Sequence, residues 1–276
     1  MERKNLKKLL LLLAFCACLT AACSKQPTQA PAAPPVEATD WEYIAQKGEL
    51  IIGLDDSFPP MGFRDEANNL VGFDIDFAEA VCAELGLKPV FQPIEWSAKE
   101  MELDGKHIDC IWNGMSITPE RMESMSLTRG YLNNRIIIMT VPGVTVTSKE
   151  DLITLNVGTQ AKSAALEVCM EDPIYEELEN FFEYATYEEV IMDMDTGRIQ
   201  AMIVDEVLGM YKNSMRSVSF NVSSVDFGDD LYAVGMRKGD VELTQKIQQT
   251  IDGLIASGKA AEISNKWFGA DIVIKP

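Results

Sequence analysis

The sequence predicts an α/β protein of two lobes, each built on a mostly parallel sheet flanked by helices. Short apolar strands alternate with amphipathic helices after residue 41, and this alternation is typical of parallel sheets. The chain has 276 residues, and the roughly 250 that follow its first 22 are enough for two domains of ordinary size. A weak internal similarity also favours two lobes, because Gly105–Ile111 and Gly197–Ile203 each read as a helix stop, a basic residue and a buried strand.

The first half of the predicted fold opens with an apolar strand over 50–54. We expect Asp74 to cap the next helix and Gly86 to end it, with an apolar residue at every fourth position over 77–85. A helix capped by Thr118, with Pro at its first position, closes this half. The intervening strand, helix and strand are expected over 90–94, 97–104 and 108–112.

The second half repeats the alternation. A strand over 135–141 is long enough to cross between the lobes. Ser148, Ser163 and Thr186 are placed to cap three helices, the last of them in a capping box with Glu189. Three further strands and a final helix are expected over 155–158, 199–204, 231–236 and 241–256.

The first 22 residues read as an export signal that is not part of the fold. Basic residues are followed by an apolar run over 9–19, which is too short to span a bilayer comfortably, and then by small residues before Cys23. This order resembles a bacterial lipobox, whose cysteine is acylated, although Thr20 stands where the commonest lipobox has Leu; an ordinary cleaved signal is the alternative. We therefore expect a protein lipid-anchored through Cys23 on the outer side of the cell membrane. Residues 23–40, rich in Pro, Ala, Gln and Thr, read as a flexible tether.

The charge and the scarcity of histidine exclude several functions. Asp and Glu outnumber Lys and Arg by 43 to 24, a formal charge of −19, and removal of the signal takes this to about −22. So acidic a body argues against nucleic acid, whose phosphates must be neutralised by cations. His107 is the one histidine and there is no Cys-x-x-Cys pair, so we expect neither a His-based triad, nor a metal, nor a cofactor.

Three cysteines remain once the signal and Cys23 are set aside. Cys82 lies on an apolar helix face and Cys110 in an apolar strand, so these two and Cys169 are expected to be buried small hydrophobic residues. A disulfide between Cys82 and Cys110 is the alternative.

Residues 113–121 carry the first feature that points to a ligand. A strand ends and a helix begins there, which is where open α/β sheets bind ligands, and free backbone N–H groups together with Ser116 favour an anion. Arg121 lies in the first helical turn, where the helix dipole disfavours a cation unless an anion is held beside it, and Arg pairs with a carboxylate through two hydrogen bonds. The alternative is a surface ion pair of Arg121 with Glu120 or Glu123.

Asp205 and two aromatic residues carry the other features. Asp205 ends the apolar strand over 202–204, so its carboxylate can accept an ammonium group in a cleft; equally, it can cap the following helix. Phe58 and Trp96 each follow a strand and can enclose the stem of a small ligand, although each taken alone reads as a core aromatic. Together these features indicate an amino-acid-shaped ligand.

One segment resembles a known family. Residues 72–85, GFDIDFAEAVCAEL, fit the signature of the polar amino-acid-binding proteins of ABC importers (bacterial extracellular solute-binding proteins, family 3). The resemblance covers essentially the whole chain after the signal, and it includes 55–61, 112–121, 131–135 and 266–269.

The resemblance implies the fold of type II periplasmic binding proteins, in which two crossover strands join the lobes and the lobes close on the ligand. We accordingly expect one lobe over 41–136 plus 230–276 and the other over 137–229.

The resemblance also assigns roles in the site. Arg121 matches the arginine that takes the α-carboxylate of the ligand, and Asp205 matches the carboxylate that takes its α-ammonium. Phe58 falls on the stacking aromatic and Trp96 on a side-chain pocket position. The other matched positions are the strand end at Asn113, Gly114 and Ser116, and Asp55, where members with cationic ligands carry an Asp.

The loop of the second lobe departs from the family. Lys162 stands where Gly is usual, in the segment Gln160–Ala164. Ser163 can still offer its N–H and hydroxyl to the carboxylate, and Lys162 is expected to add a cation near the ligand.

The resemblance thus implies a monomeric binding protein that is not an enzyme. It would capture a free polar L-amino acid and deliver it to the permease subunits of an ABC importer. A cationic side chain and a neutral polar one, such as that of glutamine or cystine, are both open. The alternatives are an enzyme similar to cyclohexadienyl dehydratases, with Glu95 or Glu206 as the acid, and a sensory binder that feeds a receptor.

Overall fold

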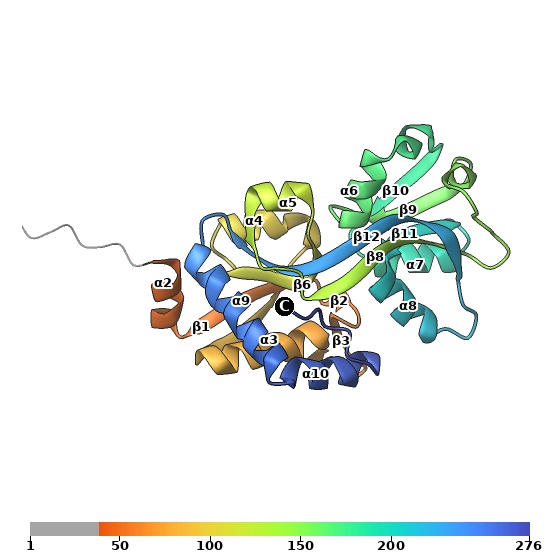
Figure 1. Ribbon diagram of the computed structural model, residues 1–276. Helices are drawn as coiled ribbons and strands as arrows, with labels where there is room; N and C mark the ends of the chain where they lie inside the picture. Colours follow the sequence, from red (N-terminus) through yellow and green to blue (C-terminus); the bar gives the residue numbers. More distant parts are fainter. Residues whose placement is uncertain (1–38) are drawn as a thin grey trace, which may run out of the picture. The chain divides into compact units, whose positions relative to one another are not determined.

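The computed structural model of the protein describes residues 39–276, which form an α/β architecture of two lobes (Figure 1). Two long strands, β8 (Leu132–Thr140) and β12 (Asn221–Arg237), pair antiparallel and run through both lobes. The strand order of the large sheet is β10-β9-β11-β8-β12-β6-β1-β5, with β7 paired to β12. The two crossover strands are thus β8 and β12, while the residue bounds expected for the lobes stay a prediction.

The expectations for the N-terminus fall almost entirely outside this range. The export signal of 1–22, the anchor Cys23 and the tether up to residue 38 lie outside the described residues. At the last two tether positions, Thr39 caps α2 (Asp40–Lys47) through a capping box with Glu42. Among the helices that the structure describes, none is long and apolar enough to cross a membrane.

The first lobe is built on a parallel sheet in which β1 pairs with both β5 and β6. Helices α3 and α9 cover one face of this sheet, whereas α4 and α5 lie on the other (Figure 1). A small separate sheet consists of β2 (Ser57–Phe58), β3 (Gly62–Arg64) and β4 (Leu70–Val71). The remaining elements are β1 (Glu49–Leu54), α3 (Phe73–Leu85), β5 (Lys88–Pro93), η1 (Trp96–Ala98), α4 (Lys99–Asp104), β6 (Cys110–Ser116), α5 (Pro119–Ser124), β7 (Met125–Leu127), α9 (Val241–Ala256) and α10 (Lys259–Phe268).

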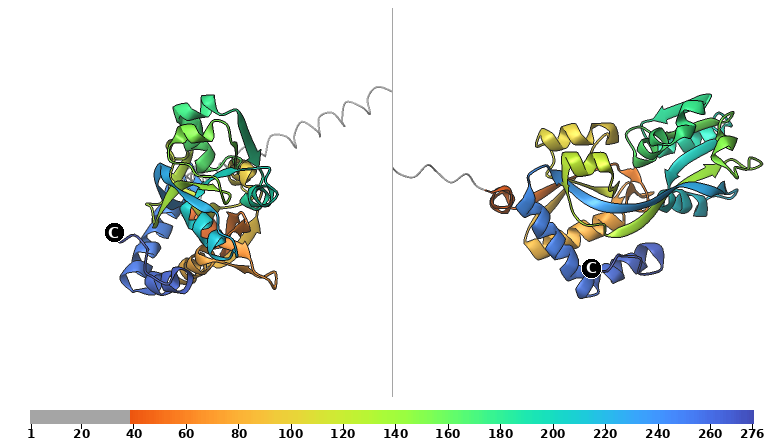
Figure 2. Two further views of the ribbon diagram at one scale, coloured as in Figure 1. Left: turned by 90° about the vertical axis from the view of Figure 1, so that its right-hand side faces the viewer. Right: turned by 45° about the horizontal axis from the view of Figure 1, so that its top comes forward.

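The second lobe repeats this layered plan. Strand β9 is parallel to β10 and β11, and β11 joins β8 antiparallel. Helix α6 packs against β9 and β11, as does α7, and α8 packs against β8 and β11; the views in Figure 2 show β8 and β12 passing from this lobe to the other. The elements are η2 (Lys149–Leu152), β9 (Asn156–Gln160), α6 (Ala164–Glu171), η3 (Pro173–Glu177), β10 (Asn180–Tyr184), α7 (Tyr187–Asp195), β11 (Ala201–Asp205) and α8 (Glu206–Ser214).

The apolar patterns of the sequence account for the packing. Every residue of β6 and β11 is buried, as expected of strands that are covered on both faces. One stripe of α9 is also buried and consists of Leu243, Ile247, Ile251 and Leu254. The three cysteines in the described part of the chain are buried and unpaired, which confirms the expectation of small hydrophobic residues: Cys82, Cys110 and Cys169.

Helix α3 begins differently from the prediction, which gives Asp74 as its cap. The helix begins at Phe73 and follows Gly72. The Asp74 carboxylate instead accepts the Gly114 N–H at 2.6 Å and the Tyr131 hydroxyl at 2.7 Å. The prediction is wrong because two buried donors from distant parts of the chain take the carboxylate.

Candidate functional site

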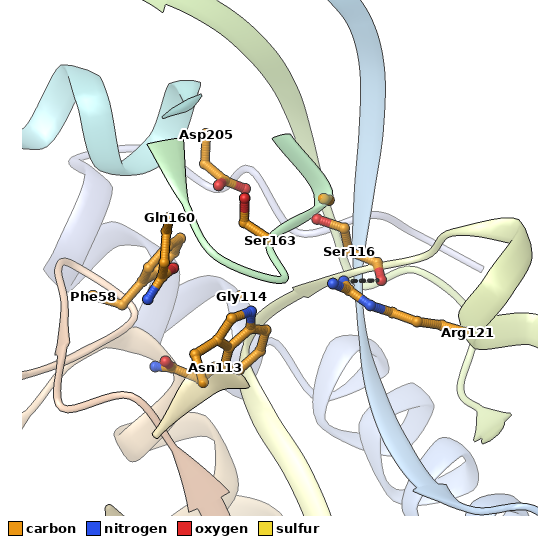
Figure 3. A pocket seen from close by; sticks show the side chains of 10 residues that line it. Phe58, Asn113, Gly114, Ser116, Arg121, Gln160, Ser163 and Asp205 are labelled. Atoms are coloured by element: carbon orange, nitrogen blue, oxygen red, sulfur yellow. Dashed lines mark hydrogen bonds between the residues drawn. The ribbon is translucent and has the colours of Figure 1, made fainter. Parts of the chain in front are cut away.

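A pocket lies between the lobes, where β6, β9 and β11 end (Figure 3). Eight of the ten residues predicted to bind a ligand line this pocket, namely Phe58, Trp96, Asn113, Gly114, Ser116, Arg121, Ser163 and Asp205. Gln160 and Ala164 complete the lining. The other two predicted residues, Asp55 and Lys162, are not part of it.

Arg121 is buried in the pocket and only 2% exposed. Rather than pairing with the glutamates of its own helix, it reaches across to α6, where its Nη2 lies 3.1 Å from Glu167 Oε1. Its Nη1 donates to the Ser116 carbonyl at 2.9 Å, and Nη2 also donates to the Lys162 carbonyl at 3.4 Å. These bonds use three of the five guanidinium N–H groups, and Nε has no partner among the described residues. A carboxylate in the pocket would therefore meet unsatisfied donors on Arg121.

Asp205 ends β11, but its side chain makes no capping bond to α8. Its Oδ1 instead accepts the Asn134 amide at 2.8 Å and the Tyr232 hydroxyl at 2.9 Å. The same Asn134 nitrogen donates to Asp230 Oδ2 at 2.8 Å, so two carboxylates share one amide. Burial, together with the negative charge of Asp230, raises the pKa of Asp205 to about 7. Among the described residues, Asp205 has hydrogen-bond donors but no ion-pair partner, and an ammonium group in the pocket would supply one.

The end of β6 offers the pocket acceptors rather than donors. The Gly114 N–H is taken by Asp74, so only the Gly114 carbonyl remains for a ligand. Gly114 has φ 55°, and a Cβ there would lie 3.0 Å from Phe58 Cε1, so glycine is favoured at this position. The Ser116 hydroxyl donates to Asp230 Oδ2 at 2.7 Å, so its single proton is not available to a carboxylate. We therefore expect Ser116 Oγ to accept a hydrogen bond from an ammonium group, and not to bind an anion as its position at the start of a helix predicted.

Aromatic rings and a helix start complete the walls. The Phe58 ring lies 6.1 Å from that of Tyr187 in the other lobe, and the Arg121 guanidinium lies 5.9 Å from the Trp96 ring. Ser163 caps α6 as predicted, because its Oγ accepts a backbone N–H of that helix at 3.1 Å. Its hydroxyl therefore still has a proton to donate to an anion.

Lys162 keeps the conformation that glycine favours, with φ 56°. Its side chain is exposed, and its carbonyl oxygen accepts Lys99 Nζ at 3.0 Å and Arg121 Nη2 at 3.4 Å. Lys99 is 1% exposed, and burial, with a smaller effect of Arg121, lowers its pKa to about 8. Two cations of the first lobe thus hold this loop of the second lobe through one carbonyl, while the Lys162 side chain stays outside the pocket.

Replacing Lys162 by glycine is expected to leave ligand affinity unchanged and to raise the free energy of unfolding by about 1 kcal/mol. A left-handed conformation costs a residue with a side chain about 1–2 kcal/mol, and glycine avoids this cost. Part of the stabilisation is lost because glycine gives the unfolded chain more conformational freedom. Calorimetric titration measures the affinity, and chemical denaturation measures the free energy of unfolding. Lys106→Gly is the matched control, since Lys106 also has a positive φ, of 59°, and does not line the pocket. A loss of affinity in Lys162→Gly but not in Lys106→Gly would show that the Lys162 side chain contacts the ligand.

Several polar residues of the site were not singled out from the sequence. Gln160 ends β9 in the same way that Asp205 ends β11, so its position at a strand end was an available signal. Asn134 and Asp230 lie within the crossover strands, where no local pattern marks them. In the sequence, Glu167 resembles an ordinary exposed helix residue, because its contact with Arg121 depends on the tertiary structure.

Residues 39–276 contain no group of three or more His, Cys, Asp or Glu side chains that could hold a metal ion. Neither Glu95 nor Glu206, the two acids considered for an enzymatic role, lines the pocket. Glu206 is paired with Arg135 at 2.7 Å.

Known proteins resemble this chain over most of its length. The family model for bacterial extracellular solute-binding proteins, family 3, matches residues 50–270. The L-cystine-binding protein TcyJ of Escherichia coli (strain K12) is 26% identical over 234 residues, which are 83% of this chain and 86% of that protein. The L-arginine-binding protein of Pseudomonas aeruginosa (strain PAO1) is 28% identical over 229 residues, 80% of this chain and 88% of that protein.

A solved structure is similar as well. It is an ABC uptake transporter substrate-binding protein from Streptococcus pneumoniae with bound histidine. The two chains are 33% identical and superpose with a TM-score of 0.82, over 87% of this chain and all of that one. Cystine, arginine and histidine share the α-carboxylate and α-ammonium groups and differ in their side chains.

Proposed function

Because the chain belongs to the bacterial extracellular solute-binding proteins, family 3, we propose that it captures a polar L-amino acid between its lobes for an ABC importer. The observation that carries the proposal is the placement of Arg121 and Asp205 in one pocket, a cation from the first lobe and a carboxylate from the second. A zwitterion complements both charges, with its α-carboxylate on Arg121 and Ser163 and its α-ammonium on Asp205 and Ser116.

Closure of the lobes follows from this division of the site. Neither lobe alone satisfies both charged groups of the ligand, so ligand binding favours the closed state over the open one. Direct bonds between the lobes add to this preference, including those of Lys99 and Arg121 to the Lys162 carbonyl. Charge-assisted hydrogen bonds contribute about 1.5–3 kcal/mol each, so a few of them are enough for micromolar binding, near −8 kcal/mol.

The place of this binding protein is proposed from its N-terminal sequence. A basic, apolar and small-residue order before Cys23 supports export and lipid anchoring on the outer side of the cell membrane. From there the closed protein would deliver its amino acid to the permease. The two relatives named above are binding proteins, which supports a binder rather than an enzyme.

A thermal-shift screen against the twenty amino acids, ornithine and cystine tests the proposal. Ligand at about 100 times its Kd stabilises the native state by about 2.7 kcal/mol, which corresponds to a rise in Tm of roughly 5–10 °C for a chain of this size. The proposal fails if no amino acid raises Tm. Turnover of prephenate or arogenate by the same sample would instead support the enzyme alternative.

A further inference from the structure

The part of the pocket that would receive the ligand's side chain lies away from Arg121. Phe58, Gln160 and Asn113 lie on one side of the pocket, and Arg121 with Ser116 on the other (Figure 3). An amino acid whose α-carboxylate is held by Arg121 would therefore extend its side chain toward these three residues.

Asp55 stands beside this end of the pocket, but both of its carboxylate oxygens are already in use. Oδ1 accepts the backbone N–H and the hydroxyl of Ser57, at 2.9 and 2.6 Å. Oδ2 accepts Gln160 Nε2 at 2.8 Å, in a buried bond that joins the two lobes. Asp55 is 6% exposed and does not line the pocket. Gln160 thus covers Asp55 and separates the pocket from the carboxylate with which a cationic side chain would pair.

Two polar atoms at this end are uncommitted. Both N–H groups of Gln160 are used, because Nε2 also donates to the Ala185 carbonyl at 2.9 Å, and no group in residues 39–276 donates to Gln160 Oε1. Asn113 Oδ1 accepts the Asp55 N–H at 3.1 Å, which fixes its amide orientation. The buried Asn113 Nδ2 then has no partner in the described chain. Asn113 Nδ2 packs against Gly62, where an added Cβ would lie 2.6 Å from it, so Gln160 Oε1 is the atom at this end that a ligand can reach, and it is neutral.

We propose that Gln160 is a specificity-determining residue, which covers Asp55 and sets the pocket for a neutral side chain that donates a hydrogen bond to Gln160 Oε1. Carboxamide and urea groups have this chemistry. In the closed state, a guanidinium or ammonium group at this end would be buried against Gln160, and it would reach the Asp55 carboxylate only if the Gln160–Asp55 bond did not form on closure. This inference rests on the proposed function and narrows the class of its ligand.

Citrulline and arginine are the most discriminating pair of probes. They have nearly the same shape, but the side chain of citrulline ends in a neutral urea group and that of arginine in a cationic guanidinium group. Isothermal titration of the wild-type protein is expected to give a Kd for citrulline at least tenfold lower than that for arginine. Gln160→Ala uncovers Asp55 and is expected to lower this preference at least tenfold. Gln249→Ala, on the exposed side of α9, is the matched control and should leave the preference unchanged.

Arginine binding as tightly as citrulline, or more tightly, in the wild-type protein would overturn the proposal, and this comparison requires no variant. An unchanged preference in folded Gln160→Ala would also overturn it. If neither probe binds and the amino acid that raises Tm carries no carboxamide group, the inference is wrong and the proposed function stands. If no amino acid raises Tm, the proposed function itself has failed.

Discussion

Replacing Arg121 by alanine is expected to weaken binding of the cognate amino acid by about 100- to 1000-fold. The substitution removes two charge-assisted hydrogen bonds to the α-carboxylate, each of about 1.5–3 kcal/mol, and it leaves Glu167 without its partner across the lobes. Isothermal titration gives the Kd of variant and wild type. Arg121→Lys is expected to recover little of the loss, because an ammonium group cannot bind the carboxylate while also replacing the guanidinium's bonds to the Ser116 and Lys162 carbonyls.

Arg198→Ala is the control for this experiment. Arg198 has a side chain 74% exposed and pairs with Asp193 at the surface of the second lobe. Its removal should leave the Kd unchanged. Near-normal affinity in Arg121→Ala, in a protein whose Tm shows that it is folded, would contradict the assignment of the α-carboxylate to Arg121.

Ligand affinity is expected to fall steeply as the pH drops below 7, through Asp205. Burial and the neighbouring Asp230 raise the pKa of Asp205 to about 7, and the protonated carboxyl cannot balance the charge of an ammonium group. Proton competition at one group with a pKa of about 7 raises the apparent Kd about tenfold at pH 6 and about 100-fold at pH 5. The groups facing Asp205 are Asn134, Tyr232, Asp230 and the more distant Arg121.

Titrations between pH 5 and 8 test this expectation. At pH 6 binding should release close to one proton, which appears as a dependence of the binding enthalpy on the ionisation enthalpy of the buffer. Asp205→Asn should bind weakly at every pH and show no such slope. A Kd that is constant from pH 5 to 8 in the wild-type protein would rule out Asp205 as the ammonium site.

The stability of the empty protein should respond to pH with the opposite sign. Burial raises the pKa of both Asp74 and Asp205 to about 7, well above the ordinary value for Asp of 3.8. Between pH 4 and 7 the folded protein therefore holds more protons on these groups than the unfolded chain does. Their contribution to the free energy of unfolding should thus decrease as the pH rises through this range, and urea denaturation without ligand measures it.

Local patterns in the sequence predicted much of the fold. Helix α9 was predicted over its observed span because its apolar stripe has a clear helical period. The caps at Thr118, Ser163 and Thr186 were confirmed, since capping depends on residues within one turn. The predicted strand over 231–236 is only the end of β12, which spans 17 residues. The rest of that strand is mostly polar and partly or fully exposed, so it lacks the apolar pattern that marks a buried strand.

Most residues of the site could be predicted from the sequence, but the hydrogen bonds between them could not. Residues at strand ends, such as Ser116 and Asp205, are visible in the sequence because topology brings such ends together. Their partners are not, because Asp230 lies 114 positions from Ser116 and Gln160 lies 105 from Asp55. These long-range hydrogen bonds determine which donors and acceptors remain free to bind a ligand. They change Ser116 from an expected donor to an acceptor, and they cover Asp55.

The most direct test of the central claim is a thermodynamic cycle between Arg121 and the α-carboxylate. The best-binding amino acid and its decarboxylated amine are titrated into wild-type protein and Arg121→Ala. If Arg121 holds the α-carboxylate, the amine should bind the wild type at least 100-fold more weakly than the amino acid, and the variant should discriminate between the two by less than tenfold. If Arg121→Ala weakens both ligands by the same factor, Arg121 does not bind the carboxylate and the proposed binding mode is wrong.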